Sequence, residues 1–483
     1  MGLIHIEIPH RGLVVLAGPA GSGKSTWAAR HFAPDEIVSS DACRARVGRG
    51  EEDMASSSQA FDLFYSLLEQ RLAAGRLAVA DSTALSTGSR QRLLRLARRH
   101  ELPATLVILA ASLETCLRQN ARRARRVPER VIRHHVQQLR QLLAHLDEER
   151  FDRVYVLGDD VLHTGDYTVR RVPLPVERPE TGPFDIIGDL HGCFLELVEL
   201  LERLGYRRQG DVLAHPAGRQ AVFLGDLTDR GPYSVSTILL VEGMVRAGQA
   251  LYVPGNHCRK LYRWLTGHQV LLRHGLERTV RELEALPAAL RRAVGERFCR
   301  LYEAAPPYMI LDGGRLVVAH AGIKEDMIGR MSRRIRNFCL YGDATGEVTD
   351  DGLPVRRDWA RHYRGDALVV YGHTPVAEPV LRYNTINIDQ GCVFGGRLTA
   401  FRYPEGDVVQ VAAHTVYDPR PSIRPVPQED GAYDGAYSMS GASGRAEVAS
   451  PVGSRGTEAF GSLRGASGTG LATEETPVGG PGK

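Results

Sequence analysis

The sequence predicts an α/β protein with two folded domains and a disordered C-terminal tail. An apolar run at residues 13–17 leads directly into a glycine-rich loop and a helical segment, the order in which a parallel-sheet nucleotide-binding domain begins. Beyond residue 180, five short apolar segments each end in a cluster that contains Asp, Asn or His, which indicates a domain that holds metal ions. From residue 419 onward Gly, Ser, Ala and Pro dominate, with too few aromatic residues to build a core.

Length and composition set broad limits on the class of protein. The 483 residues are enough for about two to three domains, and 43% hydrophobic with 24% charged residues is ordinary for a globular protein. No apolar run is long enough to span a bilayer, and residues 1–9 lack the pattern of a signal peptide. Seven cysteines without paired spacing favour free thiols in a reducing compartment. We therefore expect a cytoplasmic protein with no membrane partner.

Charge alone does not indicate a nucleic-acid-binding protein, because the formal net charge is only +4. Arginines are dense between Arg90 and Arg153, a run that a solvated helix face would also explain. Lysine, in contrast, is rare, and it occurs only at Lys24, Lys260, Lys324 and Lys483.

The glycine-rich loop has the full G-x-x-x-x-G-K-[ST] pattern, from Gly18 to Ser25. Its glycines let backbone N–H groups surround phosphates, and the N-terminus of the following helix (residues 26–30) adds a positive dipole end. Lys24 is expected to reach the β- and γ-phosphates, and Ser25 to bind Mg²⁺. The cofactors predicted for this domain are ATP and Mg²⁺, and the predicted binding residues are Gly18, Gly21, Ser22, Gly23, Lys24, Ser25 and Thr26.

Acids follow two further predicted strands of this domain. Asp41 comes after residues 36–38, where it is either a base that takes a proton from an attacking hydroxyl or the N-cap of a helix. Asp81 follows residues 77–80 and could orient Mg²⁺ from a second shell. Residues 106–111 and 151–157 are the remaining predicted strands, the latter expected to be the last of the domain. Between them, an arginine run ends at Val127-Pro128, and it is typical of a mobile lid over the γ-phosphate.

Prolines at positions 173, 175 and 179 indicate a linker of polyproline II character. The predicted boundaries are 1–170 for the first domain, 171–182 for the linker, 183–418 for the second domain and 419–483 for the tail.

The clusters of the second domain are, in chain order, Gly188–Gly192, Gly225–Pro232, Gly255–His257, Ala319–Gly322 and Tyr371–Pro375. Each of them alone is weak, since a single histidine after a strand is more often part of the core. Together they supply the ligands for two metal ions that clamp the attacking and leaving oxygens of a phosphate ester. Asp226 is the natural ligand to be shared by both ions.

This set of clusters resembles the calcineurin-like, binuclear metallophosphoesterase superfamily, whose fold is a β-sandwich flanked by helices. The resemblance implies that Asp226 bridges the two metals, and it implies two ligand sets: Asp189, His191 and Asp226 for one metal, and Asp226, Asn256, His320 and His373 for the other. It also implies that His257 is the general acid, that Asp229 orients it and that Arg230 grips the phosphate. A bidentate arginine matches the geometry of a phosphate.

The first domain resembles the kinase module of bacterial polynucleotide kinase-phosphatases. The resemblance rests on the phosphate loop, on the Ser-Asp-x-x-Arg of residues 40–44 and on the lid that ends Arg126-Val127-Pro128. It implies that Asp41 is the general base for a polynucleotide 5′-hydroxyl and that Arg44 contacts the acceptor. The lid arginines that would stabilise the transferred group are Arg122, Arg123 and Arg126, and which of them acts is open.

Further stretches of the second domain resemble the phosphatase module of the same family, namely residues 255–261, 274–279, 338–347 and 387–396. The resemblance implies removal of 3′-phosphates and 2′,3′-cyclic phosphates from RNA ends with Mn²⁺ or Ni²⁺. Cys258 stands where many superfamily members carry an acid, which removes no ligand. Asp389 could tune the site or simply end a strand. Proteins of that family usually continue into a ligase module, and we expect none in residues 419–483, because no lysine lies between Lys324 and Lys483 to carry an adenylate.

The function that the sequence favours is therefore bifunctional healing of RNA ends. One alternative keeps both folds and makes them a small-molecule kinase fused to a dinucleoside-polyphosphate or protein serine/threonine phosphatase. Another is an RNA-binding scaffold with vestigial sites, which the intact phosphate loop and metal ligands disfavour. DNA in place of RNA, a separate ligase or RNA methyltransferase partner, and a homo-oligomeric state all stay open.

Overall fold

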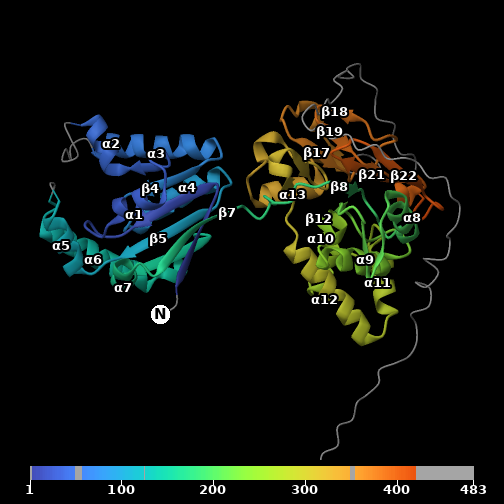
Figure 1. The fold of residues 1–483 in the computed structure, drawn as a ribbon, viewed down its shortest axis with the longest axis horizontal. Helices are drawn as coiled ribbons and strands as arrows, with labels where there is room; N and C mark the ends of the chain where they lie inside the picture. Colours follow the sequence, from blue (N-terminus) through green and yellow to red (C-terminus); the bar gives the residue numbers. More distant parts are fainter. Residues whose placement is uncertain (1–2, 49–56, 124–125, 349–353, 420–483) are drawn as a thin grey trace, which may run out of the picture. The chain divides into compact units, whose positions relative to one another are not determined.

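The computed structural model describes residues 3–48, 57–123, 126–348 and 354–419, which fold into the two predicted α/β domains (Figure 1). The α/β class, with a parallel sheet in the first domain, is confirmed. The tail from residue 420 onward lies outside the described residues, so its predicted disorder stays a prediction. Within the described ranges, no helix is both long enough and apolar enough to cross a membrane.

The first domain, blue to green in Figure 1, alternates strands and helices. In chain order its elements are β1 (Ile4–Pro9), β2 (Gly12–Ala17), α1 (Lys24–His31), β3 (Ile37–Ser39), α2 (Ser40–Val47), α3 (Ser57–Ala73), β4 (Leu77–Asp81), α4 (Thr87–Arg99), β5 (Ala104–Ala110), α5 (Leu113–Ala121), α6 (Glu129–Ala144), β6 (Arg153–Gly158), α7 (Asp159–Thr164) and β7 (Tyr167–Val172). Every strand predicted for this domain is present, with its ends shifted by one or two residues.

The central sheet of this domain has the strand order β3-β4-β2-β5-β6, and all of its pairs are parallel. β2 lies in the middle, and all six of its residues are buried because helices cover both faces. α3 and α4 pack on one face through Phe64, Leu68 and Leu93, while α1 packs on the other through Trp27 and Ala28. Parallel strands end at one edge, so the phosphate loop after β2, α2 after β3 and Asp81 at the end of β4 share that edge.

The structure adds a strand pair that the sequence reasoning missed. Residues 151–157 were predicted to be the last strand of the domain, but β7 follows and pairs in parallel with β1. The two strands stand more than 150 residues apart, and neither has a turn signal that would indicate its partner. Ile6 and Ile8 of β1 are fully buried against the same sheet face as α1, which explains why the ribbon forms.

The predicted linker is also more ordered than its prolines suggest. β7 extends to Val172, and after it Leu174 and Val176 are buried at 3% and 0% exposure. The N–H of Arg178 donates to the carbonyl of Ile310 at 2.9 Å, which attaches the segment to the second domain. Leu174 and Val176 explain this packing, because removing their apolar side chains from water stabilises the packed segment relative to a solvated linker.

The second domain, green to red in Figure 1, is built on two sheets. Its elements are β8 (Phe184–Ile187), α8 (Phe194–Leu204), β9 (Arg207–Gln209), β10 (Val212–Ala214), β11 (Gln220–Gly225), α9 (Ser234–Arg246), β12 (Ala250–Pro254), α10 (Asn256–Leu265), α11 (Leu276–Glu284), α12 (Ala288–Ala304), β13 (Met309–Leu311), β14 (Leu316–Val318), α13 (Arg333–Tyr341), β15 (Ala344–Val348), β16 (Pro354–Arg356), β17 (Leu368–Tyr371), β18 (Leu381–Arg382), β19 (Thr385–Asn387), β20 (Asp389–Gln390), β21 (Arg397–Tyr403) and β22 (Val408–Ala412).

The two sheets face each other across one apolar core. One sheet has the order β12-β11-β8-β21-β20, with β22 added on β21, and the other has the order β13-β14-β17-β19-β18. Side chains from both sheets, such as Val222 and Leu224 on one and Val318 and Val370 on the other, are buried together. The domain is therefore a β-sandwich, and strands of both sheets deliver the ligand clusters to one end of it.

A buried ion pair joins the strands at the other end of the first sheet. Arg219, just before β11, lies 2.9 Å from a carboxylate oxygen of Asp185 and 2.7 Å from one of Glu405. Its guanidinium also donates to the carbonyl of Phe184 at 2.8 Å. Asp185 is fully buried, so its charge depends on Arg219 and on Arg402 at 3.2 Å.

We predict that Arg219→Met lowers the free energy of unfolding of the second domain by about 3 kcal/mol, because it leaves Asp185 buried with an incomplete partner set. The measurement is urea denaturation followed by tryptophan fluorescence in a Trp27→Phe background, where the remaining tryptophans, Trp264 and Trp359, report on this domain. Arg397→Met is the control: its side chain is 50% exposed and its ion pair with Glu378 is 3.5 Å long. It should cost under about 1 kcal/mol, and an equal loss in both variants would contradict the account.

Candidate active sites

The phosphate loop of the first domain has the backbone geometry that its glycines permit. Gly18, Gly21 and Gly23 adopt φ values of 154°, 84° and 91°, which side chains rarely adopt. A Cβ at Gly21 would also collide with the carbonyl group of Cys116 on α5. The loop is thus held open beside the N-terminus of α1, where backbone N–H groups can meet phosphate oxygens.

Lys24 is the buried cation of this loop. Its side chain is 8% exposed, and Nζ donates to the carbonyls of Gly18 and Pro19 at 2.9 and 2.8 Å. Burial lowers the pKa of Lys24 to about 8, an effect that the nearby Asp81 carboxylate opposes. Burial raises the pKa of Asp81, which accepts a hydrogen bond from the Ser25 side chain. Asp81 and Ser25 therefore form a hydroxyl–carboxylate pair of the kind that can hold Mg²⁺ from the first and second shells.

Asp41 and Arg44 lie one turn apart on α2, and their side chains form an ion pair of 2.7 Å. Arg44 is only 9% exposed in its side chain, whereas Asp41 is 53% exposed. The N-cap alternative for Asp41 does not hold, because Ser39 is the N-cap of α2 and its hydroxyl accepts the N–H of Ala42. Asp41 is therefore not the N-cap, and it lies near the start of α2, at the same sheet edge as the phosphate loop.

The lid arginines are placed unequally. Arg123 lies close enough to Lys24 and Asp81 for its charge to act on the pKa of each. Arg122 caps the C-terminus of α5, and Arg126 is exposed just beyond residues 124–125, which lie outside the described ranges. The structure thus brings Arg123, of the three candidates, toward the phosphate loop.

Another contact to the loop comes from a residue that the sequence reasoning missed. His135 on α6 accepts the N–H of Ala20 at its Nδ1, at 3.3 Å. No motif marks this histidine, since it lies in an ordinary amphipathic helix more than 100 residues away.

In the second domain, strand ends position all six predicted metal ligands. Asp189, Asp226 and Asn256 follow the parallel strands β8, β11 and β12, while His320 and His373 follow β14 and β17. Two groups of side chains have ligand atoms within 4.8 Å of one another: His191, Asp226 and His257, and Asp226, His320 and His373. Asp226 belongs to both groups, as a bridging ligand would.

Asp189 has neighbours that differ from those expected of a ligand to the same metal as His191. One of its oxygens accepts the backbone N–H of Asp226 and the other that of His373, both at 2.8 Å. The first oxygen also lies 3.0 Å from Nδ1 of His320. Its carboxylate therefore faces the histidine assigned to the other metal, while His257 stands in the group where Asp189 was expected.

The site fits divalent cations in its donor chemistry. Nδ1 of His191 lies 3.0 Å from the carbonyl of Thr228, to which its N–H donates, so Nε2 keeps a free lone pair toward Asp226. Burial lowers the pKa of His191 and of His373 well below the usual value, so both rings are neutral, as ligands must be. Nε2 of His373 is buried and has no hydrogen-bond partner among the described residues, an arrangement that a bound cation would satisfy.

Glycines make room for these ligands. A Cβ at Gly225 would collide with His320 and Asp189, and one at Gly255 would collide with the Asp226 carboxylate. Four site residues themselves hold strained left-handed backbone, which is typical of functional loops: His191, Asp229, Arg230 and His373, with φ of 44°, 76°, 69° and 74°.

His257 has an ordered hydrogen-bond chain. Its Nδ1 lies 2.7 Å from Asp229, whose other oxygen accepts the hydroxyl of Thr279 at 2.8 Å. Nε2 lies 3.2 Å from Nη2 of Arg230. Because a guanidinium only donates, Nε2 accepts here and Nδ1 carries the proton that points to Asp229. The structure thus places the predicted general acid, His257, in contact with both Asp229, which was predicted to orient it, and Arg230, which was predicted to bind the phosphate.

Arg230 is contacted by residues that the sequence did not indicate. Asp418 accepts from its Nη1 at 3.2 Å, and the Arg278 side chain donates to its carbonyl. Arg356, on β16, is a further missed cation, since its charge contributes to the lowered pKa of His373. Asp418 and Arg356 lie in segments without a motif, and the stretch 274–279 that contains Arg278 gave no indication of a contact with Arg230, so only the folded arrangement identifies these contacts.

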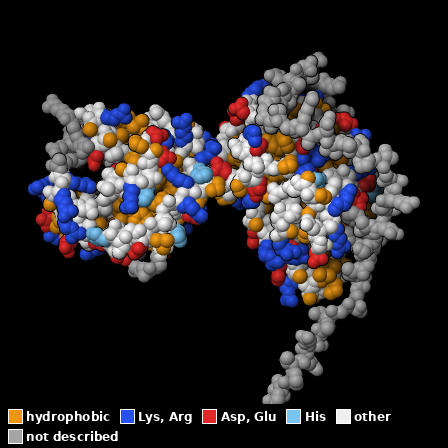
Figure 2. All heavy atoms as spheres, in the orientation of Figure 1, with side chains coloured by type: hydrophobic (Ala, Val, Ile, Leu, Met, Phe, Trp, Pro, Cys, Tyr) orange, Lys and Arg blue, Asp and Glu red, His pale blue; other side chains and the backbone are white. Residues whose placement is uncertain are grey.

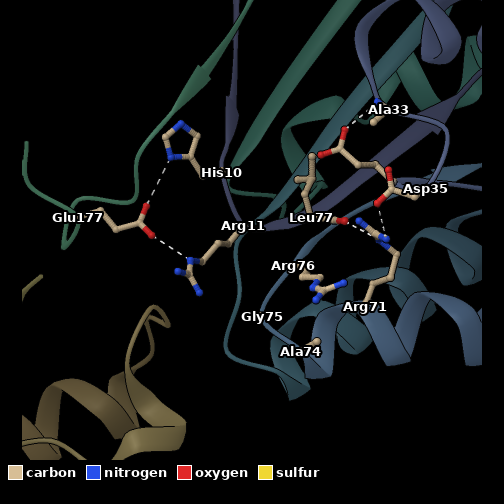
Figure 3. A pocket seen from close by; sticks show the side chains of 11 residues that line it. His10, Arg11, Ala33, Asp35, Arg71, Ala74, Gly75, Arg76, Leu77 and Glu177 are labelled. Atoms are coloured by element: carbon tan, nitrogen blue, oxygen red, sulfur yellow. Dashed lines mark hydrogen bonds and ion pairs between the residues drawn. The ribbon is translucent and has the colours of Figure 1, made fainter. Parts of the chain in front are cut away.

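A polar pocket in the first domain is distinct from both sites. It is lined by residues at the beginnings of β2 and β4, such as Arg11 and Leu77, and so lies at the sheet edge opposite the phosphate loop (Figure 3). Its Arg71 already pairs with Asp35 at 3.3 Å. Both basic and acidic side chains occur on the visible face of each domain (Figure 2).

Comparisons with known proteins agree with this division of the chain. A family described as calcineurin-like phosphoesterase matches residues 182–418, and one described as AAA domain matches residues 13–146. A bis(5′-nucleosyl)-tetraphosphatase PrpE (asymmetrical) of Geobacillus sp. (strain WCH70) is 54% identical over 235 residues, which are 49% of this chain and 96% of that protein. The protein of the same description from Bacillus subtilis (strain 168) is also 54% identical, with the same coverage.

These relatives match only the second domain. A solved structure described as a putative diadenosine tetraphosphatase covers 49% of this chain and 97% of its own, with 24% identity and a TM-score of 0.36.

We predict that metal binding to the second domain releases a proton from His320. Burial alone would lower the pKa of His320, but the carboxylates of Asp226 and Asp189 raise it to about 9, so the metal-free ring is protonated at pH 7. A cation must displace this proton, so Mn²⁺ affinity should increase with pH up to about 9, by about tenfold per pH unit if one proton is released.

Isothermal titration calorimetry with Mn²⁺, in buffers of different ionisation heat, measures the released proton directly. A Lys24→Ala background limits binding at the phosphate loop, and Asp226→Ala in that background should abolish the signal. Binding that is independent of pH between 6 and 9 would contradict the assignment.

Proposed function

The chain belongs to the calcineurin-like phosphoesterase family, and from that premise we propose that it heals broken RNA ends with two separate sites. The first domain transfers the γ-phosphoryl group of ATP to a 5′-hydroxyl end, with Mg²⁺. The second domain removes a 3′-phosphate or a 2′,3′-cyclic phosphate, with two cations such as Mn²⁺ or Ni²⁺. The observation that carries the proposal is that one chain combines a phosphate loop, which has its own acid–arginine pair, with two groups of metal-ligating side chains that share Asp226.

The kinase step uses groups that share one sheet edge. The phosphate loop and Lys24 hold the triphosphate, and Arg123 lies close enough to Lys24 for its charge to act on it. In this proposal Arg44 contacts a phosphate of the acceptor strand, and its ion pair with Asp41 supports that role. Asp41 accepts the proton of the attacking 5′-hydroxyl, and the new O–P bond forms as the bond to ADP breaks.

In the second domain, two bound cations would supply a hydroxide at neutral pH and neutralise the charge of the phosphate. The protein contributes Arg230, which binds the phosphate oxygens, and His257, which gives a proton to the leaving oxygen. His257 carries that proton on Nε2 only when Arg230 turns its N–H elsewhere, because Nε2 accepts from Arg230 in the free protein. A bound phosphate offers Arg230 that new acceptor, which leaves Nε2 of His257 available to face the leaving oxygen.

A second candidate function changes the substrate of the second domain alone. The 54% identity to proteins described as bis(5′-nucleosyl)-tetraphosphatases favours hydrolysis of a dinucleoside polyphosphate. The same residues serve either substrate, since both reactions cleave a P–O bond whose leaving group is a nucleotide. The RNA proposal is preferred because the phosphate-loop domain adds an activity at the opposite end of the same strand.

The decisive experiment offers one short RNA with a 5′-hydroxyl and a 3′-phosphate, together with ATP, Mg²⁺ and Mn²⁺. Mass spectrometry should show a phosphate gained at the 5′ end and one lost at the 3′ end. Lys24→Ala should lose only the gain, because the phosphate loop loses its cation, and Asp226→Ala should lose only the removal.

Diadenosine tetraphosphate is tested in parallel with the same three proteins. Rapid hydrolysis of it by the wild type, with neither change on the RNA, would overturn the RNA proposal and support the second candidate. Loss of both RNA activities in either variant would contradict independent sites.

The role of His257 predicts a dependence on the leaving group. His257→Ala should lower kcat by about 10²–10⁴ for an RNA 3′-phosphate, whose alkoxide leaving group needs a proton. The loss should be much smaller for p-nitrophenyl phosphate, whose leaving group is stable without one. Asp229→Asn should show the same pattern more weakly, because it disturbs only the orientation of the ring. Equal losses on both substrates would show that His257 acts on binding or folding instead.

A further inference from the structure

Lys260 lies one helical turn from the general acid candidate. Asn256 and His257 begin α10, and Lys260 follows three residues after His257, so both side chains lie on one side of the helix. Lys260 is one of only four lysines in a chain whose other cations are arginines. Its Nζ donates to the carbonyl of Arg273 at 2.5 Å. An ammonium has three donors, and within the part of the chain that the structure describes Nζ has this one hydrogen-bond acceptor, so other donors can meet a ligand.

The loop that carries Arg273 folds back over the phosphatase site. The N–H of Arg230 faces the carbonyl of Gly275 at 3.4 Å, and a Cβ at Gly275 would collide with the Arg230 backbone. His274 adopts a left-handed φ of 64°, which a non-glycine residue holds only where its surroundings enforce it. The loop between α10 and α11 is therefore fixed against the phosphate-gripping residue.

Charges around Lys260 leave a positive balance. The acids near it are Asp229, which is already bound to His257 and Thr279, and Glu277, which accepts the N–H of Gly275 at 3.1 Å. The cations near it are Arg273 and Arg230. Burial, and then the charges of Lys260 and Arg273, lower the pKa of His274, so His274 adds a neutral N–H donor beside these cations.

The same loop also presents apolar surface. Leu271 and Leu272 are 68% and 48% exposed, next to Arg273. Two exposed leucines beside free ammonium donors suit a ligand that has both an apolar ring and a phosphate, and a nucleotide has both.

We propose that Lys260, with Arg273 and His274, forms a subsite for a phosphate carried by the leaving group of the phosphatase reaction. The inference rests on the proposed function, because it takes His257 as the group that faces the leaving oxygen. In the reaction, the P–O bond to that oxygen breaks, the oxygen takes the proton of His257, and water supplies the hydroxyl on the released phosphate. The subsite meanwhile holds the second phosphate of the departing nucleotide.

Both candidate substrates satisfy this requirement. The 3′-terminal nucleotide of an RNA carries a phosphodiester on its 5′ side, and a dinucleoside tetraphosphate releases a nucleotide with phosphates of its own. A phosphoserine or a sugar phosphate does not. The site therefore selects substrates whose leaving group is itself phosphorylated.

Two small substrates isolate this contact. Adenosine 3′,5′-bisphosphate and adenosine 3′-monophosphate lose the same 3′-phosphate, but only the former carries a phosphate on its leaving group. The wild type should have the higher kcat/KM for the bisphosphate, mainly through a lower KM. Lys260→Met should reduce the ratio of the two kcat/KM values by about tenfold or more, because it removes a charge-assisted hydrogen bond.

Arg263→Met is the matched control, since Arg263 is an exposed cation on the same helix and should leave the ratio at its wild-type value. A wild type without a preference for the bisphosphate, or an unchanged ratio in Lys260→Met, would overturn the subsite. If Lys260→Met does not fold, the wild-type ratio should still fall as salt is raised, because the contact is ionic. A ratio that is insensitive to salt would then overturn it.

Failure of the proposed function looks different. In that case the wild type would leave RNA 3′-phosphate ends intact, whatever the ratio for the two adenosine phosphates. Comparing Lys260→Met on RNA 3′-phosphate and on diadenosine tetraphosphate then shows which of the two substrates uses the subsite.

Discussion

A network of carboxylate-to-backbone hydrogen bonds holds the second domain together at its site. Asp226 accepts the N–H of His257, and Asp189 accepts the N–H groups of Asp226 and His373, each at 2.8 Å. These bonds tie together the loops after β8, β11, β12 and β17, which come from both sheets of the sandwich. The acids that would bind cations therefore also fix the backbone that carries the other ligands. Their negative charge is costly to bury, and histidines and backbone N–H groups offset that cost in the free protein.

The sequence alone predicted those parts of the protein whose functional residues directly follow a strand in the chain. The strand, loop and helix around Lys24 are consecutive, and each ligand cluster directly follows its own strand. Asp189 and His373 follow strands of different sheets, so strand order alone does not bring them together, and the family resemblance is what placed them in one site. The β-sandwich followed from the same clusters through the family resemblance.

Long-range packing explains what could not be predicted. β1 and β7 pair although about 160 residues separate them, and the pairing depends on the shape of a sheet face rather than on a turn. Asp418 meets Arg230 only because the end of the domain returns to the site, and Lys260 meets Arg273 only because the loop before α11 folds back. Asp189 was assigned to a metal by analogy, yet in the free protein it faces His320, whose positive charge it stabilises.

Asp226 is the residue on which this account depends most, and anomalous X-ray scattering from crystals grown with Mn²⁺ tests it most directly. The account predicts two Mn²⁺ peaks in the second domain, one on each side of the Asp226 carboxylate, with His191 at one ion and His320 and His373 at the other. It also predicts that Asp226→Ala loses both peaks while the sandwich stays folded. A single ion, or two ions that Asp226 does not bridge, would contradict the shared-carboxylate centre.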